Sequence, residues 1–159
     1  DELARRLGNL KVPVVCANYD FAGTVLEKHI SPYVIVKKAG LKIGIIGLLT
    51  DLSAVVDSEI AAVIKYQDPV DVTNRYAAYL KDVKKCDLVI CLTHLGYDEE
   101  SYTDQMLAPK TRNVDIIVGG HSHTKLDEAS RIKNLDGKDV IIVQDWKWGM
   151  MAGNLKVDL

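Results

Sequence analysis

Two short apolar runs in this chain each end in a segment that carries histidine. Residues 114–118 read Val-Asp-Ile-Ile-Val and are followed by Gly-Gly-His-Ser-His-Thr at 119–124. Residues 87–92 read Asp-Leu-Val-Ile-Cys-Leu and are followed by Thr-His-Leu-Gly at 93–96. Sites in open α/β sheets assemble beyond the carboxyl ends of parallel strands. The repeated arrangement therefore favours an α/β sheet with both histidine segments at one edge.

The composition is that of a globular protein with one hydrophobic core. The chain has 159 residues, of which 48% are hydrophobic, and a formal net charge of −2, so we expect a single domain over residues 1–159. No basic stripe is present, which argues against a nucleic-acid partner, and no apolar stretch is long enough for a transmembrane segment. Cys16, Cys86 and Cys91 lack metal-site spacing and imply no disulfide framework.

Three helices are expected. Residues 1–7 read as the end of a helix that Gly8 stops. Asp68 can cap a second helix that begins with proline, and a third is expected from about Glu99 to Ala108, stopped by the following proline. The apolar face of the second helix is predicted to comprise Val72, Tyr76, Tyr79, Leu80 and Val83.

Strands are expected between and after these helices, and residues 125–137 read as a polar surface connection. The order of the elements predicts an α/β fold with some antiparallel pairing near the end of the chain. A turn at Ala39-Gly40 is expected to join two of the strands. The expected strands cover residues 12–17, 33–37, 42–49, 87–92, 114–118, 140–143 and 154–159.

His121 and His123 are the first candidates for metal ligands, because neutral imidazole is the commonest metal-binding side chain. Side chains one residue apart in extended backbone point to opposite sides, so such a pair can serve two ions. The alternative is a polar surface loop that happens to contain two histidines. His94 favours the metal interpretation, since it is expected at the same end of a neighbouring strand. His29 lies in a polar turn and is expected to be solvated.

Both histidine segments also carry a family resemblance. Residues 93–96 (Thr-His-Leu-Gly), Asp104-x-x-Leu107-Ala108 and residues 114–124 resemble the C-terminal half of a calcineurin-like metallophosphoesterase, with the 5'-nucleotidases as the closest match. Further stretches agree over nearly the whole chain: 12–18, 32–33, 40–48, 68–70 and 140–144.

The resemblance implies part of a four-layer α/β/β/α sandwich with mixed sheets and a dinuclear metal site. His94 and His121 would bind one divalent ion and His123 the other, with zinc or manganese as suitable metals. The implied activity is hydrolysis of phosphate monoesters, in particular nucleoside 5'-monophosphates. A cyclic-nucleotide phosphodiesterase of the same family and a non-catalytic binding or scaffold module are the alternatives. Family members are often periplasmic or displayed at the cell surface.

Several family motifs are missing from these residues. The family takes its other ligands from an Asp-x-His, a bridging Asp and a Gly-Asn-His segment, whose histidine is also the acid/base group; all would lie upstream of Asp1. The separate C-terminal domain that stacks the nucleoside base is absent too. Two dications about 4 Å apart repel by about 17 kcal/mol even at an effective dielectric of 20. Three neutral imidazoles do not offset this repulsion, so we expect the isolated chain to hold at most one ion and to be inactive.

Other residues near the histidines are weaker candidates for a role in the site. Asp98 and Asp104 follow His94 closely and are candidates to orient a metal ligand from behind it, although a solvated acidic helix start is the favoured explanation. Trp146 and Trp148 are expected to pack in the core or at its rim, with a role at the substrate entrance as the alternative. If only half of the sandwich is present, a bare apolar sheet face would favour association with another surface.

Overall fold

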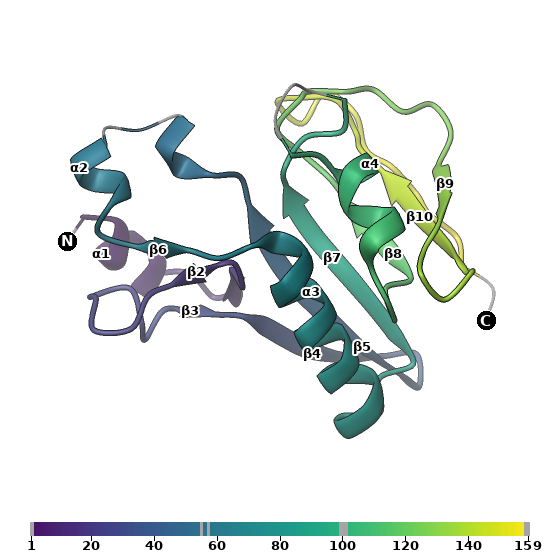
Figure 1. The fold of residues 1–159 in the computed structure, drawn as a ribbon, viewed down its shortest axis with the longest axis horizontal. Helices are drawn as coiled ribbons and strands as arrows, with labels where there is room; N and C mark the ends of the chain where they lie inside the picture. Colours follow the sequence, from purple (N-terminus) through teal and green to yellow (C-terminus); the bar gives the residue numbers. More distant parts are fainter. Residues whose placement is uncertain (1, 55, 57, 99–101, 158–159) are drawn as a thin grey trace.

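A six-stranded mixed sheet forms the centre of the computed structural model, which describes residues 2–54, 56, 58–98 and 102–157 (Figure 1). The four inner strands run parallel, and each edge strand is antiparallel to its neighbour. The α/β fold with mixed strand directions is therefore confirmed. In sheet order the strands are β4 (Tyr33–Lys38), β5 (Leu41–Leu49), β7 (Leu88–His94), β8 (Ile116–Val118), β10 (Asp139–Val143) and β9 (Ser130–Lys133).

The turn between β4 and β5 forms where the sequence predicts it. Ala39 and Gly40 both have positive φ, 51° and 80°, the combination that a two-residue hairpin turn requires. This turn fixes the antiparallel register of the two strands, with Lys38 opposite Leu41.

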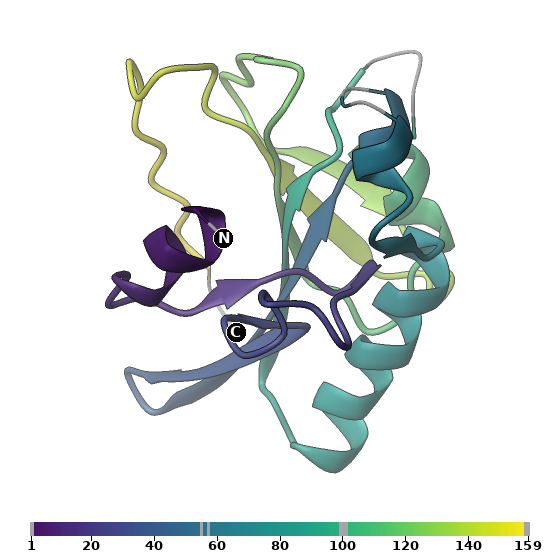
Figure 2. The same ribbon diagram turned by 90° about the vertical axis from the view of Figure 1, so that its left-hand side faces the viewer.

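One face of the sheet is covered by α3 (Pro69–Ala78) and α4 (Asp104–Leu107) (Figures 1 and 2). The Asp68 carboxylate accepts hydrogen bonds from the backbone N–H groups of Val70 and Asp71, which confirms the predicted cap. A π-helical turn, Tyr79–Val83, continues α3. Within the predicted apolar face Val72 and Leu80 are buried, but Val83 is 62% exposed, because the wider turn rotates its side chain away from the sheet.

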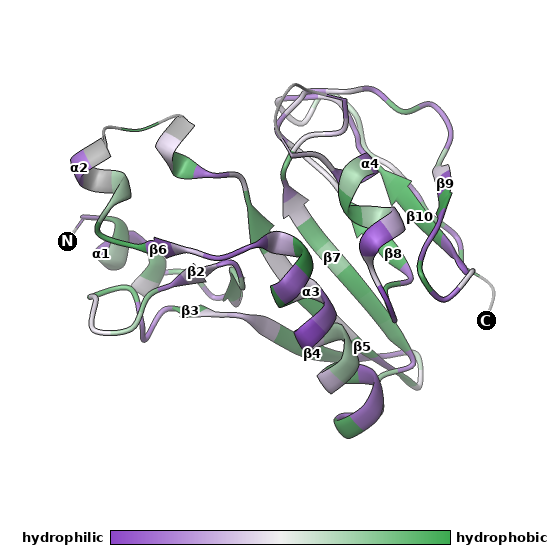
Figure 3. Cartoon of the chain, in the orientation of Figure 1, coloured by the Kyte–Doolittle hydropathy of each residue, from purple (hydrophilic) through white to green (hydrophobic). Residues whose placement is uncertain are grey.

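The core lies between these helices and the sheet, where Figure 3 shows hydrophobic residues concentrated in the central strands. Side chains from the strands interlock with side chains from the helices, which buries both sets completely. The fully buried residues include Ile46, Leu80, Val89, Cys91, Leu107, Ile117, Val140 and Ile142.

The first helix and the first strand of the chain lie beside the opposite face of the sheet (Figure 2). The opening helix α1 (Glu2–Gly8) is confirmed, whereas only Val14–Val15 of the strand expected over 12–17 is a strand, β1. The remaining short elements are β2 (Tyr19–Asp20), β3 (Ile30–Ser31), a 3₁₀ turn (Leu52–Ala54), α2 (Ser58–Ala61) and β6 (Lys65–Tyr66). β1 pairs with β3 and β2 pairs with β6.

Three sequence expectations differ from the structure. Of the helix expected from Glu99 to Ala108, residues 99–101 lie outside the described residues, and the described helix begins only at Asp104. Proline does not stop it at residue 108, because Pro109 occupies the first turn of a 3₁₀ helix, Ala108–Lys110, where its missing N–H costs nothing. The polar connection over 125–137 contains β9.

The strand expected over 154–159 is also wrong for residues 154–157, and 158–159 lie outside the described residues. Trp146, Trp148 and Gly149 all have positive φ and turn the chain away from the sheet. The segment 150–157 then runs on the same side as α1 (Figure 2) without a strand partner. No helix in the described part of the chain is long and apolar enough to cross a membrane.

Candidate metal centre

His94 and the loop of residues 119–124 lie at the same edge of the sheet. β7 ends at His94 and β8 ends at Val118, and these parallel strands are paired at Leu92 and Val118. The rings of His94 and His121 face each other edge to face with their centroids 5.0 Å apart. A Cβ at Gly120 would lie 3.1 Å from Nδ1 of His94, so glycine permits this close approach.

The loop that carries His121 and His123 is not extended, as the sequence argument assumed. Both residues have positive φ, 85° and 55°, which is uncommon for residues other than glycine. The His123 ring instead lies near Trp148, in an edge-to-face arrangement with centroids 6.3 Å apart. The structure thus brings His94 and His121 together and places His123 beside an aromatic ring.

A buried amide supports this loop. Gln144, which follows β10, is 2% exposed. In the amide orientation that satisfies its neighbours, its oxygen accepts hydrogen bonds from the backbone N–H groups of His123 (3.1 Å) and Thr124 (2.9 Å) and lies 3.1 Å from the Ser122 hydroxyl. The Ser122 oxygen also accepts a hydrogen bond from the backbone N–H of Tyr97 at 2.9 Å. The amide and the hydroxyl therefore link the segments that follow β7, β8 and β10.

Asp104 lies beneath the two histidine segments and is fully buried. Its Oδ2 accepts a hydrogen bond from the Thr93 hydroxyl at 3.0 Å, whereas Oδ1 has no hydrogen-bond partner among the described residues. Burial raises the pKa of this carboxyl to about 7. A Cβ at Gly119 would collide with Oδ2. The Asp104 carboxyl therefore contacts Thr93, next to His94, and Gly119, two residues before His121.

Asp98, the other acidic candidate, is exposed and accepts a hydrogen bond from the Thr124 hydroxyl at 2.8 Å. It thus holds the far end of the loop in place.

His29 is half-buried beside Gly8, where an added Cβ would lie 3.2 Å from Cε1 of the His29 ring. This histidine is therefore less solvated than the sequence suggests.

The donor set fits part of a metal site. Two imidazoles on facing segments suit zinc or manganese, and the buried Asp104 carboxyl accepts a hydrogen bond from the hydroxyl of Thr93, the residue before His94. Within residues 2–54, 56, 58–98 and 102–157, however, no group of three or more His, Cys, Asp or Glu side chains converges as a metal would need. A complete centre requires further donors.

Sequence and structure comparisons identify the relatives of this chain. No family model matches it. The chain is 30% identical over 167 residues to the snake venom 5'-nucleotidase of Naja atra, covering 95% of this chain and 30% of the venom protein. It is 33% identical to a 5'-nucleotidase precursor from Thermus thermophilus, whose structure superimposes with a TM-score of 0.80 over 92% of this chain and 30% of that one. The homologues of this chain are therefore 5'-nucleotidases.

Two further relatives extend the comparison. The trifunctional nucleotide phosphoesterase YfkN of Bacillus subtilis is 28% identical over 136 residues, which make up 86% of this chain and 9% of that protein. The NAD nucleotidase of Haemophilus influenzae is 28% identical, with a TM-score of 0.73 over 91% of this chain and 30% of that one. The chain spans less than a third of the length of each of these four proteins.

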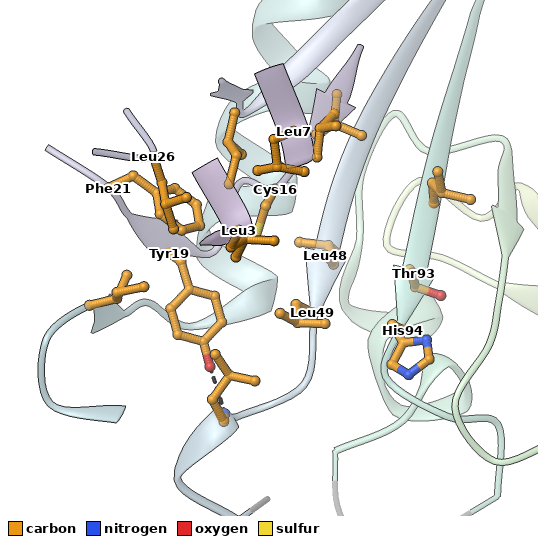
Figure 4. A pocket seen from close by; sticks show the side chains of 16 residues that line it. Leu3, Leu7, Cys16, Tyr19, Phe21, Leu26, Leu48, Leu49, Thr93 and His94 are labelled. Carbon is orange, nitrogen blue, oxygen red and sulfur yellow. Dashed lines mark hydrogen bonds between the residues drawn. The ribbon is translucent and has the colours of Figure 1, made fainter. Parts of the chain in front are cut away.

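An apolar cavity of about 490 Å³ opens beside the edge of the sheet that carries His94 (Figure 4). Figure 4 shows Leu3 and Leu7 of α1 on one side and Leu48, Thr93 and His94 of the sheet on the other. Its lining is almost entirely aliphatic and aromatic, so it offers a phosphate group little polar contact. The loop side of His94 is the more suitable place for an anionic ligand.

Two residues of the site, Gln144 and Ser122, were not predicted from the sequence. The sequence could have indicated Gln144 because it is a polar residue directly after the apolar run 140–143. For Ser122 the sequence offers only its position between two histidines. Trp146 is 37% exposed and Trp148 is 79% exposed, so neither lies in the core. Trp148 lies at the rim beside His123, in agreement with the expected rim position.

Proposed function

We propose that this chain is the C-terminal portion of a metallophosphoesterase catalytic domain that hydrolyses nucleoside 5'-monophosphates. The meeting of His94 and His121 at the carboxyl edge of a parallel sheet carries the proposal. The printed names of the relatives, 5'-nucleotidase and nucleotide phosphoesterase, support the reaction class. The four-layer sandwich, the ligands of an Asp-x-His, a bridging Asp and a Gly-Asn-His segment, and the acid/base histidine would be completed by sequence outside these residues.

In the proposed centre His94 and His121 hold one divalent ion and His123 holds the other. Bound divalent ions lower the pKa of water and stabilise charge on a phosphoryl group. The imidazoles contribute neutral nitrogen donors at fixed positions, since Gly119 and Gly120 let the loop approach Asp104 and His94 closely. Zinc and manganese are both suited to imidazole-plus-carboxylate sites.

The phosphate ester would enter from the loop side of the sheet, where Trp148 lies beside His123. A nucleotide is the favoured substrate because three of the four relatives described above are named for 5'-nucleotide or nucleotide hydrolysis. A cyclic-nucleotide diester is the second candidate, favoured by the nucleotide phosphoesterase name of YfkN. Nucleic acid is not an expected partner. The precursor and venom relatives favour a location outside the cytoplasm.

The opposite face of the sheet suggests an association surface. Leu92 is 49% exposed there, and Ile90 and Val118 on the same face are only partly buried. Exposed apolar side chains of this kind favour contact with a further protein layer. In the proposed assembly this layer is the remainder of the sandwich.

Hydrolysis of adenosine 5'-monophosphate by the intact parent protein tests the proposal. We expect phosphate release that a chelator abolishes and zinc or manganese restores. His121→Ala should lower kcat/KM by at least about a hundredfold, whereas the matched control His29→Ala should leave it unchanged. Assays with a cyclic nucleotide distinguish monoesterase from diesterase.

Two outcomes would contradict the proposal. Metal-dependent phosphatase activity of the 159-residue chain alone would show that the catalytic set is complete within it. An intact protein that purifies with no stoichiometric metal and releases no phosphate would instead support a binding or scaffold module.

A further inference from the structure

We infer that Gln144 is a positioning residue that sets the shape of the histidine loop and thereby the metal affinity of the proposed centre. The inference rests on the proposed function for its metal-binding consequence only. Its structural part concerns the hydrogen bonds that hold residues 119–124 in place.

The loop adopts a conformation that its own sequence does not favour. His121 and His123 both have positive φ, and side chains other than glycine are strained in that region. Neither residue belongs to a strand whose ladder would hold it. Such a conformation persists when surrounding contacts determine it, so the contacts around the loop identify what maintains it.

Gln144 supplies those contacts from one buried atom. Its side-chain oxygen accepts from the N–H groups of His123 and Thr124, which are the two peptide groups on either side of the strained His123 backbone. The base of the loop is fixed by β10 as well, because the N–H of Gly119 donates to the carbonyl of Val143 at 2.8 Å. The end of the loop is fixed when the N–H of Leu126 donates to the carbonyl of Gln144 at 3.1 Å.

Ser122 extends this restraint to the second histidine segment. Its hydroxyl oxygen accepts from the N–H of Tyr97, three residues after His94, and lies within hydrogen-bond distance of the Gln144 oxygen. The separation of His94 and His121 therefore depends on a chain of hydrogen bonds that starts at Gln144. The Gln144 and Ser122 side chains bond backbone N–H groups of the two histidine segments, so both residues would act through the histidines.

The amide chemistry explains why an apolar residue would not replace glutamine. Methionine has a similar length and flexibility but offers no comparable acceptor. The backbone N–H groups of His123 and Thr124 would then lose this acceptor, and the loop would relax toward ordinary negative φ values. The imidazoles would remain present but would no longer be held at one separation.

The test compares Gln144→Met with Gln105→Met in the intact protein. Gln105 lies exposed on α4 and is the matched control. Zinc affinity is measured by competition with a chelator, and backbone order by hydrogen–deuterium exchange of residues 119–126. We expect Gln144→Met to weaken zinc binding by about 10- to 100-fold and to accelerate exchange in this segment, with both quantities unchanged in Gln105→Met.

Unchanged exchange and unchanged zinc affinity in a folded Gln144→Met protein would overturn the inference. If the wild-type protein binds neither zinc nor manganese, the proposed function fails, and exchange alone decides whether Gln144 restrains the loop. Should Gln144→Met fail to fold, Ser122→Ala decides instead, since it deletes the link to Tyr97 while keeping the amide. Faster exchange around Tyr97 supports the hydrogen-bond chain, and unchanged exchange contradicts it.

Discussion

The two faces of the central sheet are built from alternate residues of the same strands but are packed very differently. On the face covered by α3 and α4, Val89 and Cys91 of β7 are fully buried, whereas Leu92 on the other face is 49% exposed. The opposite face has only partial cover, from α1 and β1 beside β5 and from the C-terminal segment near Val118 (Figure 2). Most of the stability of the chain should therefore reside on its helical side.

The strongest test of this contrast truncates one side chain on each face. Ile117→Ala removes a fully buried side chain and should lower the free energy of unfolding by about 4 kcal/mol, because the cavity adds to the lost burial. Leu92→Ala on the half-covered face should cost less than about 1 kcal/mol. Denaturant unfolding measures both, and equal losses would show that the two faces are equally packed.

The carboxyl of Asp104 makes the helical side sensitive to pH. Its pKa is raised to about 7 by burial, above the usual value near 4, so the folded state binds a proton that the unfolded state releases. Its contribution to stability is fully present at low pH and is lost as pH rises through 7, by about 2–3 kcal/mol between pH 5 and pH 8. Asp104→Asn should remove this loss, whereas the exposed Asp98→Asn should not.

Unfolding free energies of the wild type and both variants at pH 5 and pH 8 measure this effect. If the wild type loses no more stability than Asp104→Asn between pH 5 and pH 8, the Asp104 carboxyl does not hold an extra proton in the folded state.

Substitution of two glycines of β5, one on each face, compares how closely neighbouring atoms pack against the two faces of the sheet. A Cβ at Gly47 would collide with the backbone carbonyl of Val15, whereas a Cβ at Gly44 would lie 2.8 Å from Cδ1 of Leu80, the end of a flexible side chain. Gly47→Ala should therefore cost about 2 kcal/mol and Gly44→Ala about 1 kcal/mol. Thermal unfolding checks the order, and the reverse order would mean that α3 is less adaptable than the N-terminal segment.

The smallest expected effect concerns the start of α3. Asp68→Ala removes the acceptor for the N–H groups of Val70 and Asp71 and should destabilise the protein by about 1 kcal/mol. Asp82→Ala, at the other end of the same helical stretch, serves as the control. An equal effect of the two substitutions would assign the loss to charge rather than to the cap.

Much of the fold follows from local signals in the sequence. The Ala39-Gly40 turn and the Asp68 cap depend on a few adjacent residues, and the structure confirms both. The prediction of a final strand was wrong because an alternating apolar pattern, such as that of Leu155 and Val157, forms a strand only beside a free sheet edge. β10 already pairs with β8 and β9, so no edge of β10 remains for them.

For the site, the sequence predicts which segments of the chain lie together but not the conformation of the loop. Parallel strands bring His94 and His121 to one edge, and this follows from the pattern of apolar runs. The positive φ of His121 and His123 does not follow from it, because the acceptor that holds the loop is Gln144, a residue beyond the next two strands of the chain. Long-range contacts of this kind leave no local pattern.

The order of strands in the sheet has a consequence for how the chain can fold. β4, β5, β7, β8 and β10 follow one another across the sheet in the order in which they occur in the chain. Each strand emerging from the ribosome can therefore add to an edge that its predecessor has just formed. Only β9 breaks this succession, because it must wait for β10 before it has a partner. Assembly of this sheet during synthesis would thus finish with the pairing of β9 and β10, after the histidine loop has been made.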